Sequence, residues 1–489
     1  MNEDGWVIMM KIEEIKIALV TLQQDAEKVP PTGLVYLATY LNERVGLKKE
    51  NIRIFDNNMA KNIEQDILKF SPNIIGLTSM TVDYGKIIRF TKTIKKKTSA
   101  KIILGGVHVS TLPESLNKVF DMGVIGEGEE TLGDIIRTYA NFGEFKVSAL
   151  KKIKSLVFFI NEKIIMTSKR PPIELDSLPI PNFKFADKKY FRLEEIPSIS
   201  KAGIKGYLIS SRGCPYRCVF CSTSRFWGKM RFHSPEFTAK IVKRFVDDFG
   251  CNYLKVMDDL FTVSSKRIRK IREAFEKEGI MEKINGIECQ PRANLITDEL
   301  CREMKKIKIK TINFGFESGS HRMLNWLKQQ SVDPETNMKA IKLCSKYGFK
   351  IYGSLIYGSP NETIWDMEET NKFIDFAAKN GATYIWSFIA TPFPATPFWD
   401  IALERGKVSN DMDWDILSHH KIDDPLLLDE NVDREEFKRV FLKGRKKLRK
   451  MKLKLIKEFA RKNLLLMAKL TLNDPKYYLS RIYKQIIKQ

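Results

Sequence analysis

The chain lacks the features of a disulfide-stabilised, secreted or membrane-spanning protein. Its 7 cysteines among 489 residues are too few and too scattered for a disulfide framework. No run of about 18 apolar residues occurs, so no segment is expected to cross a bilayer. The first residues, Met-Asn-Glu-Asp, are acidic and contain no apolar segment of the kind that a signal peptide needs. These absences predict a reduced, cytoplasmic location.

The chain does contain enough apolar residues for a substantial core. Hydrophobic residues make up 43% of the chain, and its 489 residues are enough for two or three domains. The net charge of +23 is unevenly distributed. From Arg434 to Gln489 there are 19 Lys or Arg against 4 Asp or Glu, a net charge of +15. Most of the excess positive charge therefore belongs to the C-terminal tail.

Three cysteines lie close together in the middle of the chain. Cys214, Cys218 and Cys221 belong to the segment Ser-Ser-Arg-Gly-Cys-Pro-Tyr-Arg-Cys-Val-Phe-Cys-Ser. Thiolates at this spacing fit a [4Fe–4S] cluster, and three ligands leave one iron open. Structural zinc is one alternative, but it takes four protein ligands in pairs, and no second pair follows. Three buried thiols are the other, which the intervening Pro215 and Arg217 disfavour.

The first 145 residues alternate short apolar runs with amphipathic stretches. This alternation predicts an α/β doubly wound domain with a parallel sheet. Ligands of such a fold bind beyond the carboxyl ends of the strands. The expected strands are 15–21, 52–55, 74–79, 101–104 and 124–125, and the expected helices are 32–44, 61–70, 83–97 and 129–142.

Two loops with pairs of glycines follow strands of this half. They are Gly105-Gly106-Val107-His108 and Gly126-Glu127-Gly128-Glu129. Glycines allow a bulky ligand to approach the backbone closely, although short glycine motifs also form ordinary turns. His108 either touches a ligand or is a loop histidine hydrogen-bonded to the backbone, and we favour the second interpretation.

The second half repeats the alternation after a connector. Residues 146–203 are expected to form a hairpin, at 155–160 and 163–167, and then a proline-rich linker. Residues 204–425 predict six strand–helix units in an open, partial (β/α)6 barrel, with functional residues at the carboxyl ends of its strands. The expected strands are 207–211, 253–257, 286–289, 311–315, 350–356 and 383–388.

Polar residues follow several of these strands, and each has a structural alternative. Asp258 and Asp259 follow the second strand, where carboxylates commonly cap a helix. Arg292 follows the third and is either an anion contact or a surface arginine. Glu317 follows the fourth and is either a ligand contact or a helix-start carboxylate favoured by the helix dipole.

The cysteine spacing, with Phe220 before the last cysteine, resembles that of the radical S-adenosylmethionine (SAM) superfamily. Segments 256–262, 315–320, 353–358 and 391–397 are similar to later motifs of that superfamily in order and spacing, with Ala395 where glycine is usual. The resemblance implies that SAM chelates the open iron and is cleaved to a 5′-deoxyadenosyl radical. It implies SAM contacts at Phe220, Asp258, Asp259, Arg292, Glu317, Ser318, Gly353 and Ile356.

The first half resembles the cobalamin-binding domain of B12-dependent radical SAM proteins. The resemblance depends on Pro30-Pro31-Thr32-Gly33-Leu34 and on the two glycine loops. It implies cobalamin contacts at Gly33, Gly105, Gly106, His108, Gly126, Glu127 and Gly128. Base-off members have Asp-x-His-x-x-Gly, whose histidine ligates cobalt, whereas the matching loop here has Asn58 in place of the histidine. Cobalamin without a histidine below cobalt is therefore expected, and a domain without cobalamin stays open.

The tail, residues 426–489, contains an amphipathic pattern. Apolar residues recur at three- and four-residue steps between lysines and arginines, which predicts a helix with one basic face. Such a helix can lie on the anionic inner face of a membrane, or it can dock on the barrel and leave its basic face in water. Nucleic-acid binding is not expected, because the tail has no recognised RNA-binding motif. The apolar positions are Phe437, Phe441, Leu448, Met451, Leu455 and Phe459.

Together, the two resemblances imply an enzyme that abstracts hydrogen from an unactivated carbon and then methylates it from methylcobalamin. The same architecture supports oxidative ring closure, as in the anaerobic magnesium-protoporphyrin ester cyclase, or carbon–carbon bond formation on a lipid, isoprenoid or tetrapyrrole. A non-catalytic iron–sulfur and cobalamin sensor or carrier is the alternative from another class. The expected partners are a small or lipid-like substrate and a reductase, ferredoxin or flavodoxin as electron donor.

Overall fold

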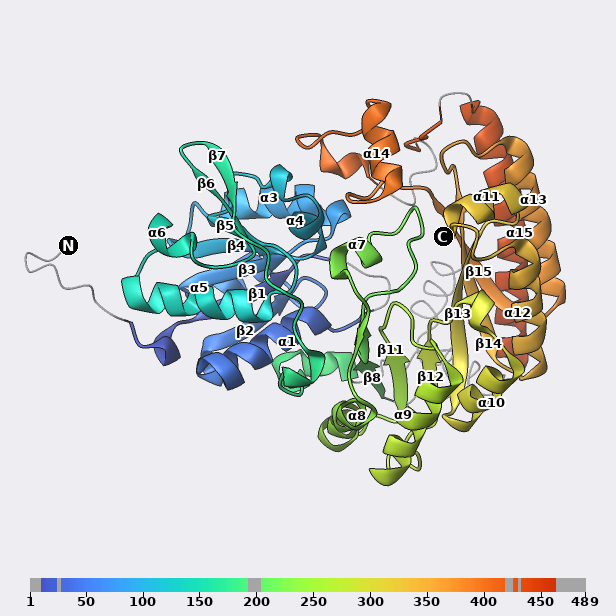
Figure 1. Cartoon of the computed structure of the whole chain (residues 1–489), viewed down its shortest axis with the longest axis horizontal. Coiled ribbons are helices and arrows are strands. Elements are labelled where there is room, and N and C mark those ends of the chain that lie inside the picture. Colours follow the sequence, from blue (N-terminus) through green and yellow to red (C-terminus); the bar gives the residue numbers. More distant parts are fainter. Residues whose placement is uncertain (1–9, 24–27, 192–203, 418–424, 430–431, 463–489) are drawn as a thin grey trace, which may run out of the picture.

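Two sheets made largely of parallel strands organise the chain, one in each half (Figure 1). The computed structural model describes residues 10–23, 28–191, 204–417, 425–429 and 432–462. The end of the expected connector and the tail after residue 462 lie outside the described residues. Among the helices that are described, none has both the length and the apolar character needed to span a membrane.

The first sheet has seven strands in the order β2-β1-β3-β4-β5-β6-β7. Strands β1 to β5 are parallel to one another, and β6 and β7 are antiparallel to their neighbours. The expected hairpin therefore extends this sheet past residue 145, because Val124 of β5 pairs with Leu156 of β6. The strands are β1 (Ile17–Thr21), β2 (Ile52–Asp56), β3 (Ile74–Thr78), β4 (Lys101–Gly105), β5 (Met122–Val124), β6 (Leu156–Ile160) and β7 (Lys163–Met166).

Helices cover both faces of this sheet, which confirms the doubly wound fold. Strand β1 is buried along its whole length, and its alternate side chains enter two different cores. Helices α1 and α5 pack on the face of Leu19, and α2 and α3 pack on the face of Val20. The helices are α1 (Thr32–Tyr40), α2 (Ile63–Phe70), α3 (Tyr84–Ile94), α4 (Val107–Thr111), α5 (Glu129–Phe142) and α6 (Val147–Leu150).

The second sheet has six strands, all parallel, in sequence order. Its outer strands are β8 and β15, so the barrel is open, as expected for a partial (β/α)6 barrel. The strands are β8 (Lys205–Leu208), β11 (Tyr253–Val256), β12 (Gly286–Cys289), β13 (Ile309–Glu317), β14 (Lys350–Tyr357) and β15 (Ala382–Ile389); β9 (Ser211–Arg212) and β10 (Arg231–Phe232) form a separate two-stranded ribbon.

Helices line the outside of this barrel (Figure 1). Side chains such as Ile312 and Phe314 of β13 share one apolar core with Phe245 of α8 and Phe373 of α13. The helices are α7 (Thr223–Trp227), α8 (Pro235–Phe249), α9 (Ser265–Lys277), α10 (Asp298–Lys306), α11 (His321–Leu327), α12 (Pro334–Lys346), α13 (Ile364–Lys379), α14 (Pro397–Glu404) and α15 (Arg434–Lys462).

The long helix α15 of the tail docks on the barrel. Phe437 is fully buried and Phe441 is 3% exposed, in the same core as Tyr357 of β14. The amide of Asn371 on α13 also donates to the carbonyl of Val440 at 3.1 Å. The apolar stripe therefore faces protein, as in the docked alternative. The side chain of Phe459 lies outside the described residues.

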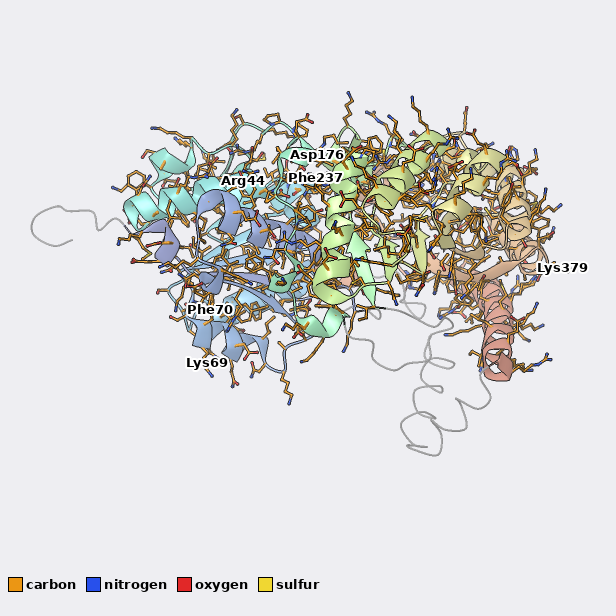
Figure 2. All side chains as sticks on the ribbon, turned by 90° about the horizontal axis from the view of Figure 1, so that it is seen from below. Arg44, Lys69, Phe70, Asp176, Phe237 and Lys379 are labelled. Atoms are coloured by element: carbon orange, nitrogen blue, oxygen red, sulfur yellow. The ribbon has the colours of Figure 1, made fainter. Side chains whose placement is uncertain are left out.

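Two segments fasten the halves to each other. Trp399 of α14 stacks on Trp414, which meets Tyr84 of α3 edge-on with ring centres 5.4 Å apart. In the connector, Asp176 accepts a hydrogen bond from His233 Nδ1 at 2.8 Å, and His233 stacks on Phe237 of α8. Figure 2 shows Asp176 beside Phe237 where the halves meet. Both sheets are thus held with their carboxyl ends toward a shared space.

Candidate functional site

One cavity of about 520 Å³ lies between the two halves. The carboxyl ends of five strands of the first sheet, β1 to β5, open into it, at the positions where doubly wound folds bind ligands. From that sheet it is lined by Thr21, Asp56, Thr78, Gly105 and Val124, and from the second half by Ile209, Arg212, Trp227, Met257 and Asp259.

The five glycines expected to contact cobalamin all line this cavity, namely Gly33, Gly105, Gly106, Gly126 and Gly128. At Gly33 and Gly126, an added side chain would point into open space, so the bare backbone faces the cavity. At Gly106, which has a φ of +95°, an added Cβ would lie 2.7 Å from the backbone nitrogen of Ser79. This position therefore requires glycine for backbone packing. A broad, flat ligand can lie against the backbone of these loops.

The loop after β2 also reaches the cavity, and Asn58 lies in its lining. The carboxylate of Asp56 accepts from the backbone N–H of Asn58 at 2.7 Å and from the hydroxyl of Tyr190 in the connector. Of the five histidines, three are described, at 108, 233 and 321, and none of those three lines the cavity. Among the described residues, no imidazole is placed to ligate a metal there.

The expected contact between His108 and cobalamin is not supported, because His108 does not line the cavity. Its side chain is fully buried, with Nε2 2.9 Å from Ser115 Oγ and Nδ1 3.3 Å from Thr81 Oγ1. The imidazole packs 3.8 Å from the ring centre of Tyr84, and burial lowers its pKa to about 3. His108 is therefore a neutral core histidine beneath the glycine loop. This is close to the favoured interpretation of a hydrogen-bonded loop histidine, except that its ring bonds side chains and not the backbone.

The three clustered cysteines lie on a loop that is clamped from two sides. The guanidinium of Arg225 donates to the carbonyl of Cys221 at 2.8 Å and to that of Cys218 at 3.4 Å. The N–H of Val219 donates to the carbonyl of Leu327, at the end of α11, at 3.1 Å. These bonds fix the loop through its backbone and do not involve the sulfur atoms.

The geometry of the thiols favours a cluster over a single zinc ion. Burial raises the pKa of Cys214 and Cys221, and the neighbouring thiols raise it further. The three sulfur atoms do not all lie within 4.8 Å of one another, whereas tetrahedral zinc with Zn–S bonds of about 2.3 Å needs sulfur atoms about 3.8 Å apart. A cubane spreads its thiolates more widely and supplies the positive charge that keeps them ionised.

Arg292 lies beside this loop and is not a surface arginine. It is 9% exposed, and its Nη1 donates to Cys218 Sγ at 3.3 Å. Nη2 donates to Ser331 Oγ at 2.6 Å, and the guanidinium lies 3.8 Å above the ring of Tyr216. A fixed positive charge at this place can hold a carboxylate or stabilise a sulfur ligand.

The two expected carboxylates after β11 have different environments. Asp258 is 2% exposed and accepts from the backbone and hydroxyl of Ser210, each at 2.6 Å, and from the hydroxyl of Ser211 at 2.8 Å. Burial raises its pKa to about 6. Asp258 thus organises the turn that leads into the cysteine loop. Asp259 lines the cavity, with Thr223 Oγ1 3.3 Å from its carboxylate.

Glu317, at the end of β13, forms a buried ion pair that the sequence did not indicate. Its Oε1 lies 2.7 Å from Nζ of Lys328, and both side chains are 7% exposed. The ammonium of Lys328 lies 5.5 Å from the ring centre of Phe220, which joins this pair to the cysteine loop. Glu317 has a φ of +63° and folds back over Gly315, where an added Cβ would be 2.1 Å from its carboxylate.

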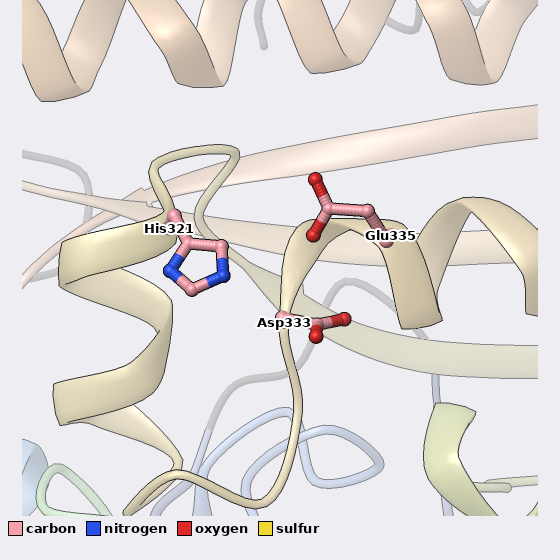
Figure 3. Close-up of side chains that lie close together, drawn as sticks. All are labelled: His321, Asp333 and Glu335. Atoms are coloured by element: carbon pink, nitrogen blue, oxygen red, sulfur yellow. The ribbon is translucent and has the colours of Figure 1, made fainter.

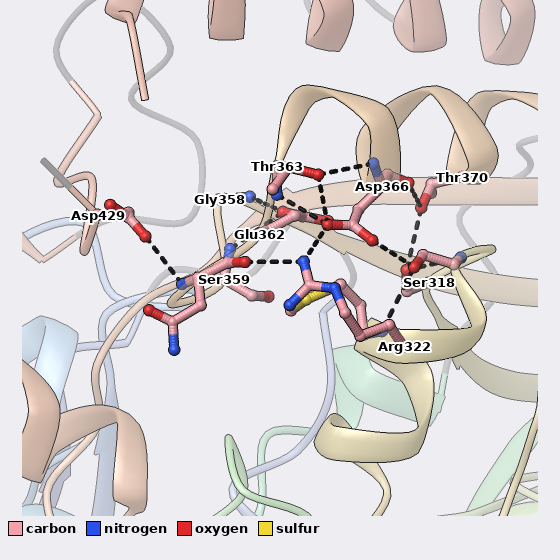
Figure 4. A network of polar contacts seen from close by, with 12 residues as sticks. Ser318, Arg322, Gly358, Ser359, Glu362, Thr363, Asp366, Thr370 and Asp429 are labelled. Carbon is pink, nitrogen blue, oxygen red and sulfur yellow. Dashed lines mark hydrogen bonds and ion pairs between the residues drawn. The ribbon is translucent and has the colours of Figure 1, made fainter. Parts of the chain in front are cut away.

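Ser318, Gly353 and Ile356 do not share one ligand-facing surface. The hydroxyl of Ser318 is fully buried, 3.1 Å from Thr370 Oγ1 (Figure 4). An added Cβ at Gly353 would be 2.3 Å from the ring of Phe316, so this glycine makes room for an aromatic side chain. Ile356 is half-buried and packs against the core shared with the first half.

A buried polar network joins the turns after β13 and β14 (Figure 4). Asp366, fully buried, accepts from Ser320 Oγ at 2.5 Å and caps α13 through the N–H of Thr363 at 2.9 Å. Glu362 accepts from the N–H groups of Gly358 and Ser359, and burial raises its pKa to about 8. The network holds two loops at the mouth of the barrel in one arrangement.

A second group of metal-ligand types lies apart from the cysteines. Atoms of His321, Asp333 and Glu335 come within 4.8 Å of one another near the start of α12 (Figure 3). Asp333 already accepts from the N–H of Thr336 at 2.7 Å as the N-cap, and the other two side chains are exposed. Helix capping accounts for Asp333, and exposed side chains such as the other two commonly lie near a carboxylate without a metal.

Both halves match known families. Residues 208–374 match the family model of the radical SAM superfamily, and residues 18–136 match that of the B12 binding domain. An uncharacterized methyltransferase of Pyrococcus horikoshii is 30% identical over 423 residues, which cover 83% of this chain and 86% of that protein. The chain belongs to the B12-binding radical SAM family. It is therefore an enzyme, and its cofactors are a [4Fe–4S] cluster, SAM and cobalamin.

Relatives within this family differ in reaction. The anaerobic magnesium-protoporphyrin IX monomethyl ester cyclase of Cereibacter sphaeroides is 24% identical over 380 residues, covering 76% of this chain and 60% of that protein. A solved structure of the radical SAM methyltransferase TsrM from Kitasatospora setae, with cobalamin and a [4Fe-4S] cluster bound, has a TM-score of 0.65 at 17% identity. It covers 87% of this chain and 84% of that one. At this identity the likeness shows the fold alone.

The residues present fit the family's cofactors. Three thiols on a fixed loop suit a cluster with one open iron, and bare glycine backbone faces a cavity at the strand ends.

Three residues of the site were not identified from sequence: Arg212, Trp227 and Lys328. Arg212 lies directly before Gly213 and Cys214, but nothing in sequence spacing indicates that its side chain crosses to the other half.

Proposed function

We propose that this enzyme methylates an unactivated carbon of a small molecule. The observation that carries the proposal is the shared cavity onto which the glycine loops of the first half and the strand ends of the second half both open. When bound, the cluster supplies the electron for SAM cleavage and the cobalamin carries the methyl group. A substrate carbon held between the two groups would be reached from both sides.

The proposal assigns a cofactor-binding role to residues of both halves. Cys214, Cys218 and Cys221 would hold the cluster, with the buried Arg292 beside Cys218 available for the carboxylate of SAM. Asp259 and Phe220 would contact SAM from the cavity side and from the cysteine loop. Gly33, Gly105, Gly106, Gly126 and Gly128 would form the surface on which the corrin lies.

Oxidative ring closure is the second candidate, supported by the cyclase relative. The two reactions differ in the fate of the methyl group of SAM. A methyltransferase delivers it to the product, and a cyclase does not. Either reaction requires a cavity from which bulk water is excluded once substrate is bound.

The test uses the anaerobically reconstituted full-length protein with SAM whose methyl group carries deuterium. Metabolite extract from a strain lacking the gene serves as the substrate source, with dithionite as the reductant. Methyl transfer predicts 5′-deoxyadenosine, S-adenosylhomocysteine and a metabolite carrying a CD3 group. Deoxyadenosine with a dehydrogenated, unlabelled metabolite would support the cyclase instead, and no deoxyadenosine from any extract would contradict both reactions.

A protein that delivers single electrons is a further expected partner, and we propose that it is an acidic ferredoxin or flavodoxin. Lys169 and Arg225 are exposed beside a second cavity that α7 lines, and Lys229, two residues after α7, is also exposed. Opposite charge steers such encounters. Charge reversal in the double variant Lys169→Glu/Lys229→Glu should slow turnover driven by reduced ferredoxin or flavodoxin and leave dithionite-driven turnover unchanged. Equal loss with dithionite would contradict the assignment.

Within the described part of the tail, the structure leaves only an electrostatic basis for contact with a membrane surface. The apolar stripe of α15 is buried against the barrel as far as Met451, which is 8% exposed. Any attraction to anionic lipid would therefore act through the lysines and arginines of the outer face, and salt would screen it.

A further inference from the structure

One arginine connects the two cofactor loops directly. Arg212 forms part of β9 and precedes Cys214 by two residues, yet its side chain reaches the first half of the chain. Its Nη1 lies 2.5 Å from Glu127 Oε1, and its Nη2 lies 2.6 Å from Glu129 Oε1. Both carboxylates belong to the Gly126–Glu129 loop that lines the cavity. The two glutamates are therefore occupied by protein.

This contact is largely buried, although it borders the cavity. The side chains of Arg212, Glu127 and Glu129 are 7%, 14% and 5% exposed. The guanidinium lies 5.4 Å from the ring centres of both Tyr36 on α1 and Trp227 on α7. Burial opposes its charge, but Glu129 and Glu127 more than offset this effect and raise the pKa of Arg212. The ion pair is thus charged and largely shielded from bulk solvent.

The remaining oxygen of Glu127 is also held. Glu127 Oε2 lies 3.0 Å from Arg231 Nη1 and accepts the backbone N–H of Ile173 at 3.0 Å. The carboxylate is thereby fixed by two strands of the β9–β10 ribbon and by the connector. A guanidinium is a planar fork with a fixed separation between its donors. With both ends fixed, Arg212 sets the distance between the glycine loop and the start of the cysteine loop.

We propose that Arg212 is a positioning residue that fixes the spacing between the cobalamin site and the iron–sulfur site. The inference rests on the proposed roles of the two loops. Arg212 is joined to the cysteine loop through its backbone and to the glycine loop through its side chain. Occupation of one site should therefore change the other, and this coupling must be reciprocal. Lysine cannot replace arginine here, because it is a point charge that cannot bond both glutamates in the same geometry.

Arg212→Lys and Arg212→Met test this role, and Arg170→Lys and Arg170→Met are the matched controls. Arg170 is also ion-paired to two carboxylates, Glu130 and Asp134 on α5, but it bonds no residue of the cysteine loop. The full-length protein is reconstituted with cluster and with Co(II) cobalamin. Pulsed electron paramagnetic resonance (EPR) then measures the distance between the reduced cluster and cobalt, and titration gives the cobalamin affinity.

The wild-type protein and the Arg170 variants should show one narrow distance distribution. Arg212→Met should broaden it and weaken cobalamin binding roughly tenfold, in the range of typical coupling between sites. Compared with Arg212→Met, Arg212→Lys should bind cobalamin more tightly, but its distance distribution should stay broad. If Arg212→Met does not fold, Glu127→Gln is used instead, because it keeps the shape of the side chain. By itself, this single variant should broaden the distance distribution. A wild-type distribution and affinity in Arg212→Met, or in Glu127→Gln when that variant is used, would overturn the proposal. The measurement needs only bound cofactors, so it is separate from any failure of the methyl-transfer proposal.

Discussion

Lys328 and Glu317 form an ion pair of 2.7 Å with both side chains 7% exposed, beside the ring of Phe220 on the cysteine loop. Lys328 lies just after α11, and the carbonyl of Leu327, one residue earlier, accepts the N–H of Val219. The end of β13, the end of α11 and the cysteine loop thus meet at one buried charge pair. A carboxylate that could contact SAM is held in place by a lysine that sequence did not single out.

Removing the lysine should destabilise the protein strongly. Lys328→Met leaves the carboxylate of Glu317 buried without its partner, which costs about 3–5 kcal/mol of unfolding free energy. The double variant Lys328→Met/Glu317→Gln should recover much of that loss. Lys372→Met is the control, because Lys372 pairs with Glu369 at 2.6 Å but is 71% exposed, and it should change stability by about 1 kcal/mol or less. Denaturant unfolding measures all three, and equal losses at both lysines would contradict the buried pair.

The clustered cysteines should be separable from the others by function. Cys214→Ala should abolish reductive SAM cleavage, because the cluster would lose one of three thiolates. Cys344→Ala should not, since Cys344 is fully buried in the barrel core. Iron content, the EPR signal of the reduced cluster and 5′-deoxyadenosine formation report the difference. Loss of cleavage in both variants would refute the cluster assignment.

Bound cobalamin should have no histidine below cobalt. Asn58 lines the cavity, and His108 is enclosed in the core. The EPR spectrum of the Co(II) form should therefore lack nitrogen superhyperfine splitting. His108→Ala should leave this spectrum unchanged while lowering the unfolding free energy by about 2–4 kcal/mol, because a buried, hydrogen-bonded ring is removed. Splitting that vanishes in His108→Ala would show that the imidazole reaches cobalt.

Glu362 should make stability depend on pH. Burial raises its pKa to about 8 in the folded protein from a usual value of 4.5. The folded state therefore holds the proton more tightly, so the stabilisation is complete below pH 4.5 and is lost as pH rises through 8. The unfolding free energy of the wild type should fall relative to that of Glu362→Gln by on the order of 1 kcal/mol per pH unit across this window. Parallel pH profiles of the two proteins would contradict a protonated Glu362.

The tail helix should behave as part of the barrel. Phe437→Ala removes a fully buried ring that packs against Gly358 and should cost about 3–5 kcal/mol of unfolding free energy. Leu453→Ala, on the same helix at 37% exposure, should change it by about 0.5 kcal/mol or less. Sedimentation with anionic vesicles should show binding that disappears at high salt and is the same in both variants. Vesicle binding that is lost only in Phe437→Ala would indicate that the apolar stripe leaves the barrel.

Local sequence patterns determined the elements and their order. The alternation of apolar runs with amphipathic stretches predicted both sheets, and α5 begins and ends at the expected residues, 129 and 142. The three-cysteine spacing predicted the cluster site for the same reason, since all its ligands lie within eight residues on one loop. The glycine that is usual in place of Ala395 also has a local explanation, because residue 395 adopts a φ of +60°, a conformation in which glycine is preferred.

Only the tertiary structure decided which polar side chains are available to ligands. Glu127 is an expected cofactor contact in sequence, but Arg212 pairs with its carboxylate, and Ser318 and Asp258 are hydrogen-bonded within neighbouring turns. The apolar stripe of the tail could equally have faced lipid or protein, and its burial against α13, β14 and β15 decided this. The physical reason is the same each time. Period and spacing describe what a residue can bond, whereas its partner comes from a segment far along the chain that only folding brings within reach.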